Sequence, residues 1–172
     1  KLGVNHWYPE NVLKDWDNMK TASPDGTAAI EQGQFASADA KSLKLHNNAT
    51  VRSTRFPYEG ERLIMGAWAR RKGITRTTGA PPWANAGMQL VWFAPDGKVV
   101  KNAHTDVVPL LDGTTPWTYY QWELPAGGKN RQYRSFELWP RIWPTATGEL
   151  ELTGITVIRQ EHSDTRSYDE KS

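Results

Sequence analysis

Short runs in which apolar and polar residues alternate recur along this chain, and Gly, Pro, Asn or Asp separate them. A period of two places successive side chains on opposite faces of a strand, so each run predicts a β-strand with one buried face. Helical periodicity is scarce. The pattern therefore predicts an all-β domain, built as a sandwich or a barrel.

The alternation and the turn residues together predict where the strands lie. The predicted strands are Ala28–Glu31, Ser42–His46, Val51–Phe56, Arg62–Arg70, Gly87–Ala94, Thr118–Leu124, Arg131–Trp139 and Glu149–Arg159. Between two of them, "APDGK" predicts a tight reversal, because Pro presets φ and Asp-Gly supports the turn. Arg71–Asn85 and Pro140–Gly148 break the rhythm and are predicted to be loops, and each carries a Trp. Long loops that carry Trp are often functional.

Size and charge restrict the class of protein. A chain of 172 residues suits one domain with a sizeable core, which we assign to residues 1–160, and the polar residues 161–172 are expected to be a tail or linker. The formal net charge of +2, from scattered Lys and Arg, gives no reason to expect binding to nucleic acid or a membrane. Cys is absent, which excludes disulfides and thiolate metal sites. We expect a monomer, cut from a longer protein.

The alternation also predicts which side chains face the core. Core positions on the central predicted strands are Leu63, Met65, Ala67, Ala69, Trp92, Phe136 and Leu138. Outward positions on the same strands are Trp68, Arg70, Gln89, Tyr133, Glu137 and Trp139. If these strands lie side by side, the outward set forms one sheet face on which rings and polar groups alternate.

Nine Trp residues are many for a chain of this length. A flat ring stacks on the apolar C–H face of a pyranose, while amides, carboxylates and guanidinium groups bond its hydroxyl rim. The candidate carbohydrate-binding residues are Trp68, Arg70, Trp83, Gln89, Glu137, Trp139 and Trp143. The simpler alternative is that these rings only cover a sheet beneath a neighbouring loop.

Several segments together resemble the galactose-binding-like β-sandwich of carbohydrate-binding modules, especially families four, nine, eleven and twenty-two. The segments are "ERLIMGAWARRKG", "MQLVWFAPDGK", "GTTPWTYYQWELPAG" and "GELELTGITV". The matching features are the strand end Ala67–Arg70, the turn at Asp96–Gly97, the aromatic segment Thr115–Gly127 and the Gly148 before the last strand. The resemblance covers roughly Ser42 to Arg159.

The resemblance implies a two-sheet antiparallel jelly roll without catalytic activity. Such modules bind polysaccharide or oligosaccharide, often on a concave sheet face, and are covalently linked to a secreted or cell-surface glycan-degrading enzyme. No cofactor is required. Many members hold a structural calcium through an Asp-Asp pair in the final strand, but Thr153–Gly154 stands at that place here. Glu10, Glu149 and Glu151 are the remaining acidic candidates, and we assign no metal ligands.

The densest aromatic stretch, "GTTPWTYYQWELPAGG", is predicted to be mainly structural. Leu124 belongs to the core, so alternation places Tyr120 and Trp122 inside with it and Tyr119 outside. Trp117 precedes the strand and is expected to pack over the end of the sandwich, as the matching Trp does in the resembling modules.

Two other function classes stay open. A small jelly-roll hydrolase would need paired carboxylates; Glu149 and Glu151 share a strand face, but Leu150 stands where jelly-roll glucanases have Asp. A lyase would need a His set in a recognisable motif, which is missing. A structural spacer domain would have its outward rings covered. The sugar also stays open: mixed Arg, Glu and Gln suit a neutral glycan, whereas Arg55, Arg70, Arg71 and Arg141 could meet a uronic acid.

Overall fold

The computed structural model describes residues 5–7, 18–21, 26–32, 41–126 and 133–160, and all its regular elements there are β-strands. The strands are β1 Asn5–Trp7, β2 Asn18–Thr21, β3 Thr27–Gln32, β4 Lys41–His46, β5 Ala49–Arg52, β6 Phe56–Pro57, β7 Arg62–Arg76, β8 Ala86–Phe93, β9 Val99–Leu111, β10 Gly113–Leu124, β11 Ser135–Ile142 and β12 Ala146–Gln160.

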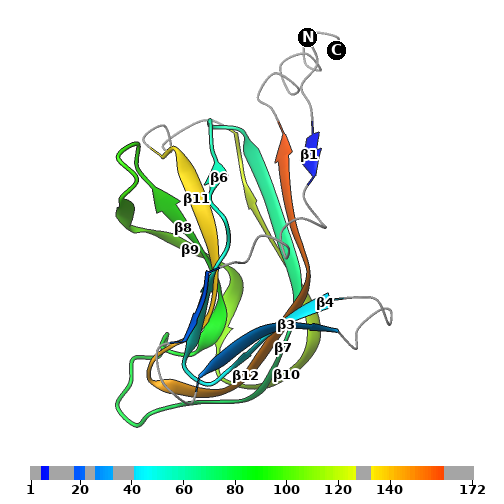
Figure 1. Cartoon of the computed structure of the whole chain (residues 1–172), viewed down its shortest axis with the longest axis vertical. Helices are drawn as coiled ribbons and strands as arrows, with labels where there is room; N and C mark the ends of the chain where they lie inside the picture. Colours follow the sequence, from blue (N-terminus) through cyan, green and yellow to red (C-terminus); the bar gives the residue numbers. More distant parts are fainter. Residues whose placement is uncertain (1–4, 8–17, 22–25, 33–40, 127–132, 161–172) are drawn as a thin grey trace.

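These strands form two antiparallel sheets that face each other (Figure 1). The first, here called the β7 sheet, has the order β10-β7-β12-β4-β3, with β1 beside β12. The second, the β8 sheet, has the order β2-β5-β11-β8-β9, with β6 beside β11. The predicted all-β, two-sheet sandwich is confirmed.

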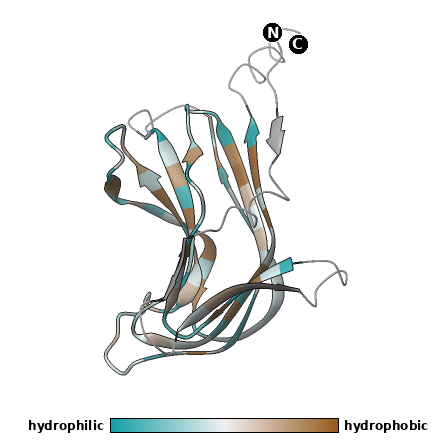
Figure 2. Cartoon of the chain, in the orientation of Figure 1, coloured by the Kyte–Doolittle hydropathy of each residue, from teal (hydrophilic) through white to brown (hydrophobic). Residues whose placement is uncertain are grey.

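The hydrophobic core lies between the sheets and follows the predicted alternation. Figure 2 shows hydrophobic segments recurring along the strands of both sheets. Every side chain predicted to face the core is buried there: Leu63, Met65, Ala67, Ala69, Trp92, Phe136 and Leu138. Tyr120, Trp122 and Leu124 pack against this core, as expected for the aromatic stretch. That stretch therefore identifies the fold more than it offers a binding surface.

The two predicted loops are shorter than the sequence suggested. β7 continues to Arg76, which leaves 77–85 as the connection to β8. β11 continues to Ile142 and β12 begins at Ala146, which leaves 143–145 between them. Lys72, Arg76 and Arg141 hid the extensions of β7 and β11, because charged residues on an outer face resemble loop residues in a sequence.

Three strands, β1, β2 and β9, were missed, and one side chain was placed on the wrong side. β9 lies at the edge of its sheet, and its buried residues, Val107 and Val108, are adjacent, so its sequence shows no regular alternation of buried and exposed positions. Tyr133 was predicted to face outward, but it packs against the core with its ring 4.9 Å from that of Trp92. It precedes the first residue of β11, Ser135, so strand alternation does not set its direction.

A buried guanidinium joins the sheets. Arg71 follows the core-facing positions of β7 and is 1% exposed. Its Nε donates to the carbonyl of Ala86 on β8 at 3.0 Å, and its Nη2 donates to the carbonyl of Pro109 on β9. Its Nη1 donates to Thr115 Oγ1 and to Tyr120 Oη on β10, both at 3.3 Å. Arg71 is therefore a structural clamp, and the suggestion that it meets a uronic acid is wrong.

Replacing this clamp should destabilise the fold. Arg71→Met would leave buried carbonyl and hydroxyl groups without their donor, so we expect unfolding free energy to fall by about 2–4 kcal/mol. Urea unfolding followed by Trp fluorescence measures this loss.

The matched control is Arg76→Met on the same strand, where a partly exposed guanidinium pairs with Asp112 at 2.9 Å and also donates to the carbonyls of Ala80 and Pro81 near the surface. Surface pairs contribute little, so its cost should stay below about 1 kcal/mol. Equal losses for the two variants would contradict the clamp.

Candidate functional site

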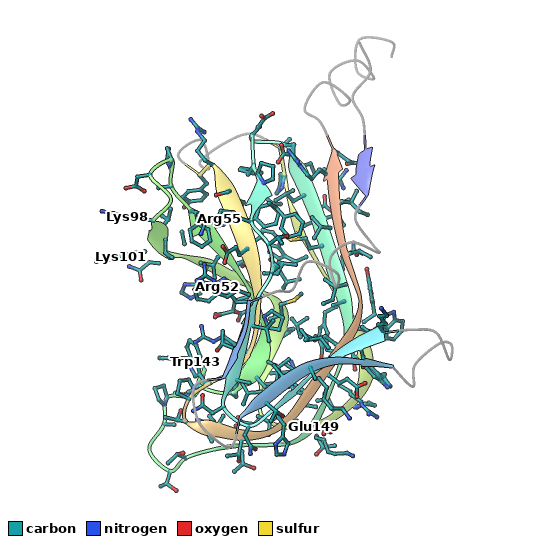
Figure 3. The ribbon with its side chains drawn as sticks, in the orientation of Figure 1. Arg52, Arg55, Lys98, Lys101, Trp143 and Glu149 are labelled. Carbon is teal, nitrogen blue, oxygen red and sulfur yellow. The ribbon has the colours of Figure 1, made fainter. Side chains whose placement is uncertain are left out.

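A cleft of about 690 Å³ lies on the outer face of the β8 sheet. Its floor includes Gln89 of β8, together with Trp139 and Arg141 of β11. Trp139 pairs directly with Gln89 across the two neighbouring strands. Alternate residues of a strand share a face, so the residues of β8 and β11 that point away from the core lie side by side on this outer face. Figure 3 shows Trp143 on this side of the molecule.

An irregular segment of β9 forms the wall of the cleft. β9 pairs Val99 with Phe93 and His104 with Val91, so it has four residues where β8 has one. A bulge of this kind bends an edge strand and re-aims its side chains. Asn102, within the bulge, has a φ of 59°, a left-handed conformation that Asn tolerates better than most residues. The bulged segment lines the cleft over the floor strands.

Two further Trp side chains line the cleft. Trp83 comes from the connection before β8, and Trp143 directly follows β11. Their ring centroids lie 5.3 Å apart at an interplanar angle of 72°. Trp83 is 54% exposed, which is unusual for such a large apolar side chain. The guanidinium of Arg141 lies over the Trp143 ring at 3.2 Å from its centroid.

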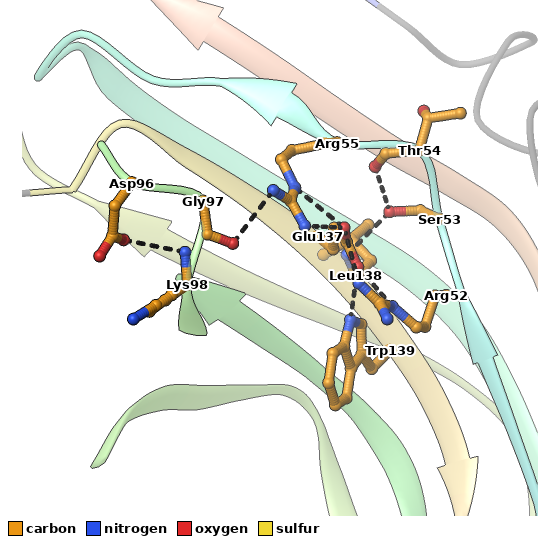
Figure 4. Close-up of polar contacts among 10 residues, drawn as sticks. All are labelled: Arg52, Ser53, Thr54, Arg55, Asp96, Gly97, Lys98, Glu137, Leu138 and Trp139. Carbon is orange, nitrogen blue, oxygen red and sulfur yellow. Dashed lines mark hydrogen bonds and ion pairs between the residues drawn. The ribbon is translucent and has the colours of Figure 1, made fainter. Parts of the chain in front are cut away.

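A carboxylate beneath the cleft fixes the third ring. The Glu137 side chain is 6% exposed and accepts hydrogen bonds from Arg52 Nε at 2.7 Å and Arg55 Nε at 3.0 Å. It also accepts one from Trp139 Nε1 at 2.9 Å (Figure 4). The Arg52 guanidinium lies 5.0 Å from the Trp139 ring centroid, and that of Arg55 lies 3.6 Å from the Phe93 ring centroid. Glu137 thus positions Trp139, with little surface left for a ligand.

Two opposing effects act on the pKa of Glu137. Burial is the largest and would raise it, but hydrogen bonds from Arg52, Trp139 and Arg55 and the charge of Arg52 outweigh burial. The pKa is therefore lowered, and Glu137 is ionised at neutral pH.

A second polar group crosses the cleft floor. Gln89 Nε2 donates to Asp106 Oδ1 on β9 at 3.1 Å, and Arg141 Nη1 donates to Gln89 Oε1 at 3.4 Å. Burial lowers the pKa of Arg141 to about 10, so its guanidinium stays charged at neutral pH. This row runs from β9 to β11 and holds the Gln89 amide in one orientation.

The predicted site residues fall on two different sheets. Trp83, Gln89, Glu137, Trp139 and Trp143 gather at the β8 sheet. Trp68 and Arg70 belong to β7 in the other sheet, so the idea of one shared face is correct for β8 and β11 and wrong for β7.

Trp68 and Arg70 have partners of their own on the β7 sheet. The Trp68 ring lies 5.5 Å from that of Tyr119. Arg70 pairs with Glu151 at 2.6 Å and lies 5.1 Å from the Trp117 ring. Trp117, expected to precede its strand, lies within β10, and its ring is next to this outward-facing guanidinium of β7.

Sequence reasoning did not single out Arg52, Asp106 or the bulge of β9. Alternation places Arg52 opposite to the core-facing Val51, so continuing the face assignment along β5 would have found it. Asp106 carried no such signal, because β9 was not recognised as a strand.

The acidic residues of β12 do not form a metal site. Glu151 accepts hydrogen bonds from Ser42 at 2.7 Å and from Arg70, so its oxygens are occupied. Across the described ranges, no three His, Cys, Asp or Glu side chains cluster as metal ligands. Glu10 lies outside the described residues. These residues do not fit a calcium site, and we derive no role for that ion.

Comparison with known proteins gives the fold. No protein-family model matches the chain, and no curated protein matches it in sequence. Among solved structures, the CBM22-1 and GH10 modules of endo-1,4-beta-D-xylanase 10B from Clostridium thermocellum, complexed with xylohexaose, are similar at a TM-score of 0.53 and 8% identity. That match covers 92% of this chain and 28% of the other.

Two further solved structures are similar. The enzymatically active domain of bacteriophage CBA120 tailspike protein 4 matches at a TM-score of 0.52 and 10% identity, over 87% of this chain and 20% of that one. A CBM22-1 xylan-binding domain from Paenibacillus barcinonensis matches at a TM-score of 0.49 and 12% identity, over 93% and 96% of the two chains.

At such identities the likeness concerns the fold alone. This chain spans less than a third of the xylanase and tailspike structures and shares a β-sandwich with each. The resemblance to galactose-binding-like modules is thus confirmed as a likeness of fold. In the part of the chain that the structure describes, no helix has the length and apolarity needed to cross a membrane.

The lowered pKa of Glu137 predicts how acid affects stability. An unfolded Glu has a pKa of about 4.3, so the contribution of Glu137 is complete above that value. It is lost as the pH falls through the lower pKa of the folded state. Glu137→Gln removes the charge that pairs with Arg52 and Arg55, so it should lower the unfolding free energy at pH 7. We expect a loss of only about 1–3 kcal/mol, because the two arginines are partly exposed and water screens their interaction with Glu137.

Urea unfolding of both proteins between pH 7 and pH 3 tests this expectation. The difference in unfolding free energy should be largest at pH 7 and shrink in acid. If this difference did not change with pH, the charge of the Glu137 carboxylate would not be the source of the stabilisation. Glu123→Gln, which breaks an exposed pair with Arg62, is the control and should cost less than about 1 kcal/mol at pH 7.

Proposed function

We propose that this chain is a non-catalytic carbohydrate-binding module whose ligand, a polysaccharide or oligosaccharide, lies in the cleft on the β8 sheet. One observation carries the proposal: Trp83, Trp139 and Trp143 come together in a cleft whose floor also presents Gln89 and Arg141. Rings with interleaved hydrogen-bonding groups match a sugar's apolar face and hydroxyl rim.

The cleft is organised before any ligand arrives. Glu137 and Arg52 hold Trp139, while Arg141 stacks on Trp143. A side chain that is already ordered loses little conformational entropy on binding, so more of its contact energy remains as affinity. Trp83 is the most exposed of the three rings and offers the freest stacking surface.

The carboxylates near the cleft favour binding over hydrolysis. Glycosidases generally need one carboxyl group as acid and a second as nucleophile or base. Glu137 is held by two arginines, and Asp106 accepts a hydrogen bond from Gln89. Neither is placed as a proton donor, which supports a binding role.

Fold comparison supports the proposal without deciding it, because one fold hosts many functions. A similar fold occurs in a xylanase structure that contains a CBM22-1 module and xylohexaose. We extend the proposal to the whole protein: the module directs an attached glycan-degrading enzyme, secreted or at the cell surface, to its polysaccharide.

A polysaccharide panel tests the proposal. Affinity electrophoresis finds ligands, and calorimetry then measures affinity for each one found. Trp139→Ala and Trp143→Ala should each weaken binding by about tenfold or more, since each removes a stacking ring. Reducing-end and unsaturated-product assays on the same mixtures should stay flat.

Trp68→Ala is the matched control, because it removes an equal ring from the opposite sheet. Its affinity should stay within about twofold of the parent. Product release would show an enzyme instead, and loss of binding in Trp68→Ala alone would move the site to the β7 sheet. Unchanged melting temperatures separate binding defects from folding defects.

A further inference from the structure

The cleft and its rim have an excess of positive charge. Among the described residues there, five are cationic and three are carboxylates. The cations are Arg141, which lines the cleft, and Arg52, Arg55, Lys98 and Lys101, which Figure 3 labels on this side of the molecule. The carboxylates are Asp96, Asp106 and Glu137. One of these carboxylates, Glu137, forms ion pairs with both Arg52 and Arg55.

Arg141 stands out within this set. It lines the cleft, and no carboxylate among the described residues pairs with it. A guanidinium has five N–H donors, and the Arg141 hydrogen bond described here is the single long one to Gln89. Its Nε is buried without a partner. Burying a cation whose N–H donors have no acceptors costs free energy, unless a bound ligand supplies those acceptors.

The geometry of Arg141 suits a planar anion. Its guanidinium lies over the Trp143 ring, at 3.2 Å from the ring centroid, and the N–H groups of a guanidinium lie in its plane. A carboxylate is planar and accepts two parallel N–H bonds from such a group. Trp83 and Trp139, in the same cleft, would carry the sugar rings on which that carboxylate is mounted.

We propose that the ligand is an acidic glycan and that Arg141 binds the carboxylate of a uronic acid residue in the cleft. Lys101, exposed on the wall, adds attraction for further acidic residues along the same chain. This inference rests on the proposed function and adds the chemical class of the ligand. Of the two alternatives, neutral and acidic sugars, it favours the acidic ones.

The experiment compares each acidic polysaccharide with its own carboxyl-reduced form. Probes are glucuronoxylan, polygalacturonate and alginate, each native and after chemical reduction of its carboxylates to alcohols, with κ-carrageenan as a sulfated probe. For at least one uronate probe, affinity should fall by about tenfold on reduction, since a charge-assisted bidentate contact is lost. Binding of the native form should also weaken as salt rises from 20 to about 500 mM.

Variants assign that effect to one residue. Arg141→Gln should lose about tenfold affinity for the native uronate and keep its affinity for the reduced form within about twofold. Arg141→Lys keeps the charge but lacks the planar guanidinium, so its affinity for the native uronate should lie between those of the parent and Arg141→Gln. Arg62→Gln, which removes a charge at the β7 sheet, is the control and should bind like the parent.

The outcomes separate the inference from the function beneath it. Equal binding of native and reduced glycans, equal losses of both in Arg141→Gln, or binding of the sulfated probe alone would each overturn the inference and leave a carbohydrate-binding module standing. Binding of none of the probes and of no neutral polysaccharide would overturn both.

Discussion

The Arg71 guanidinium is buried between the sheets because two unfavourable free energies offset each other there. Burying a cation is expensive, but the carbonyls of Ala86 and Pro109, on β8 and β9, would also be costly to leave without donors. Arg71 meets both needs at once, because its long fork reaches from β7 to the facing sheet. The cleft depends on this link, since β8 forms its floor and β9 its wall.

A buried charge with its partners arranged around it also organises the outer face of the β8 sheet, but there the central group is a carboxylate. Glu137 is almost buried, and Arg52, Arg55 and Trp139 surround it. Its charge fixes a Trp ring and two guanidinium groups, so this side of the cleft is built around a shared counterion. Arg141 lacks such a counterion among the described residues, and this contrast between neighbouring arginines is what points to an anionic ligand.

Much of the fold could be predicted from local pattern. The buried faces of β7, β8 and β11 followed alternation, because side-chain direction in a strand depends only on position parity. Strand ends were predicted less well. Ending β7 at Arg70 excluded Arg71, although parity places Arg71 on the same face as Ala69. The edge strand β9 was missed because its bulge and its mostly exposed positions interrupt the alternation, which leaves the adjacent Val107 and Val108 as its buried residues.

The sequence by itself determined the sandwich, its core and the outward direction of the candidate rings, since these follow from residue type and parity. Only the tertiary structure decided which outward residues share a surface. Trp68 and Trp139 look equivalent in the sequence, yet they lie on opposite sheets. Sheet membership depends on pairing between distant segments, such as β11 with β8, and parity carries no information about which strands become neighbours.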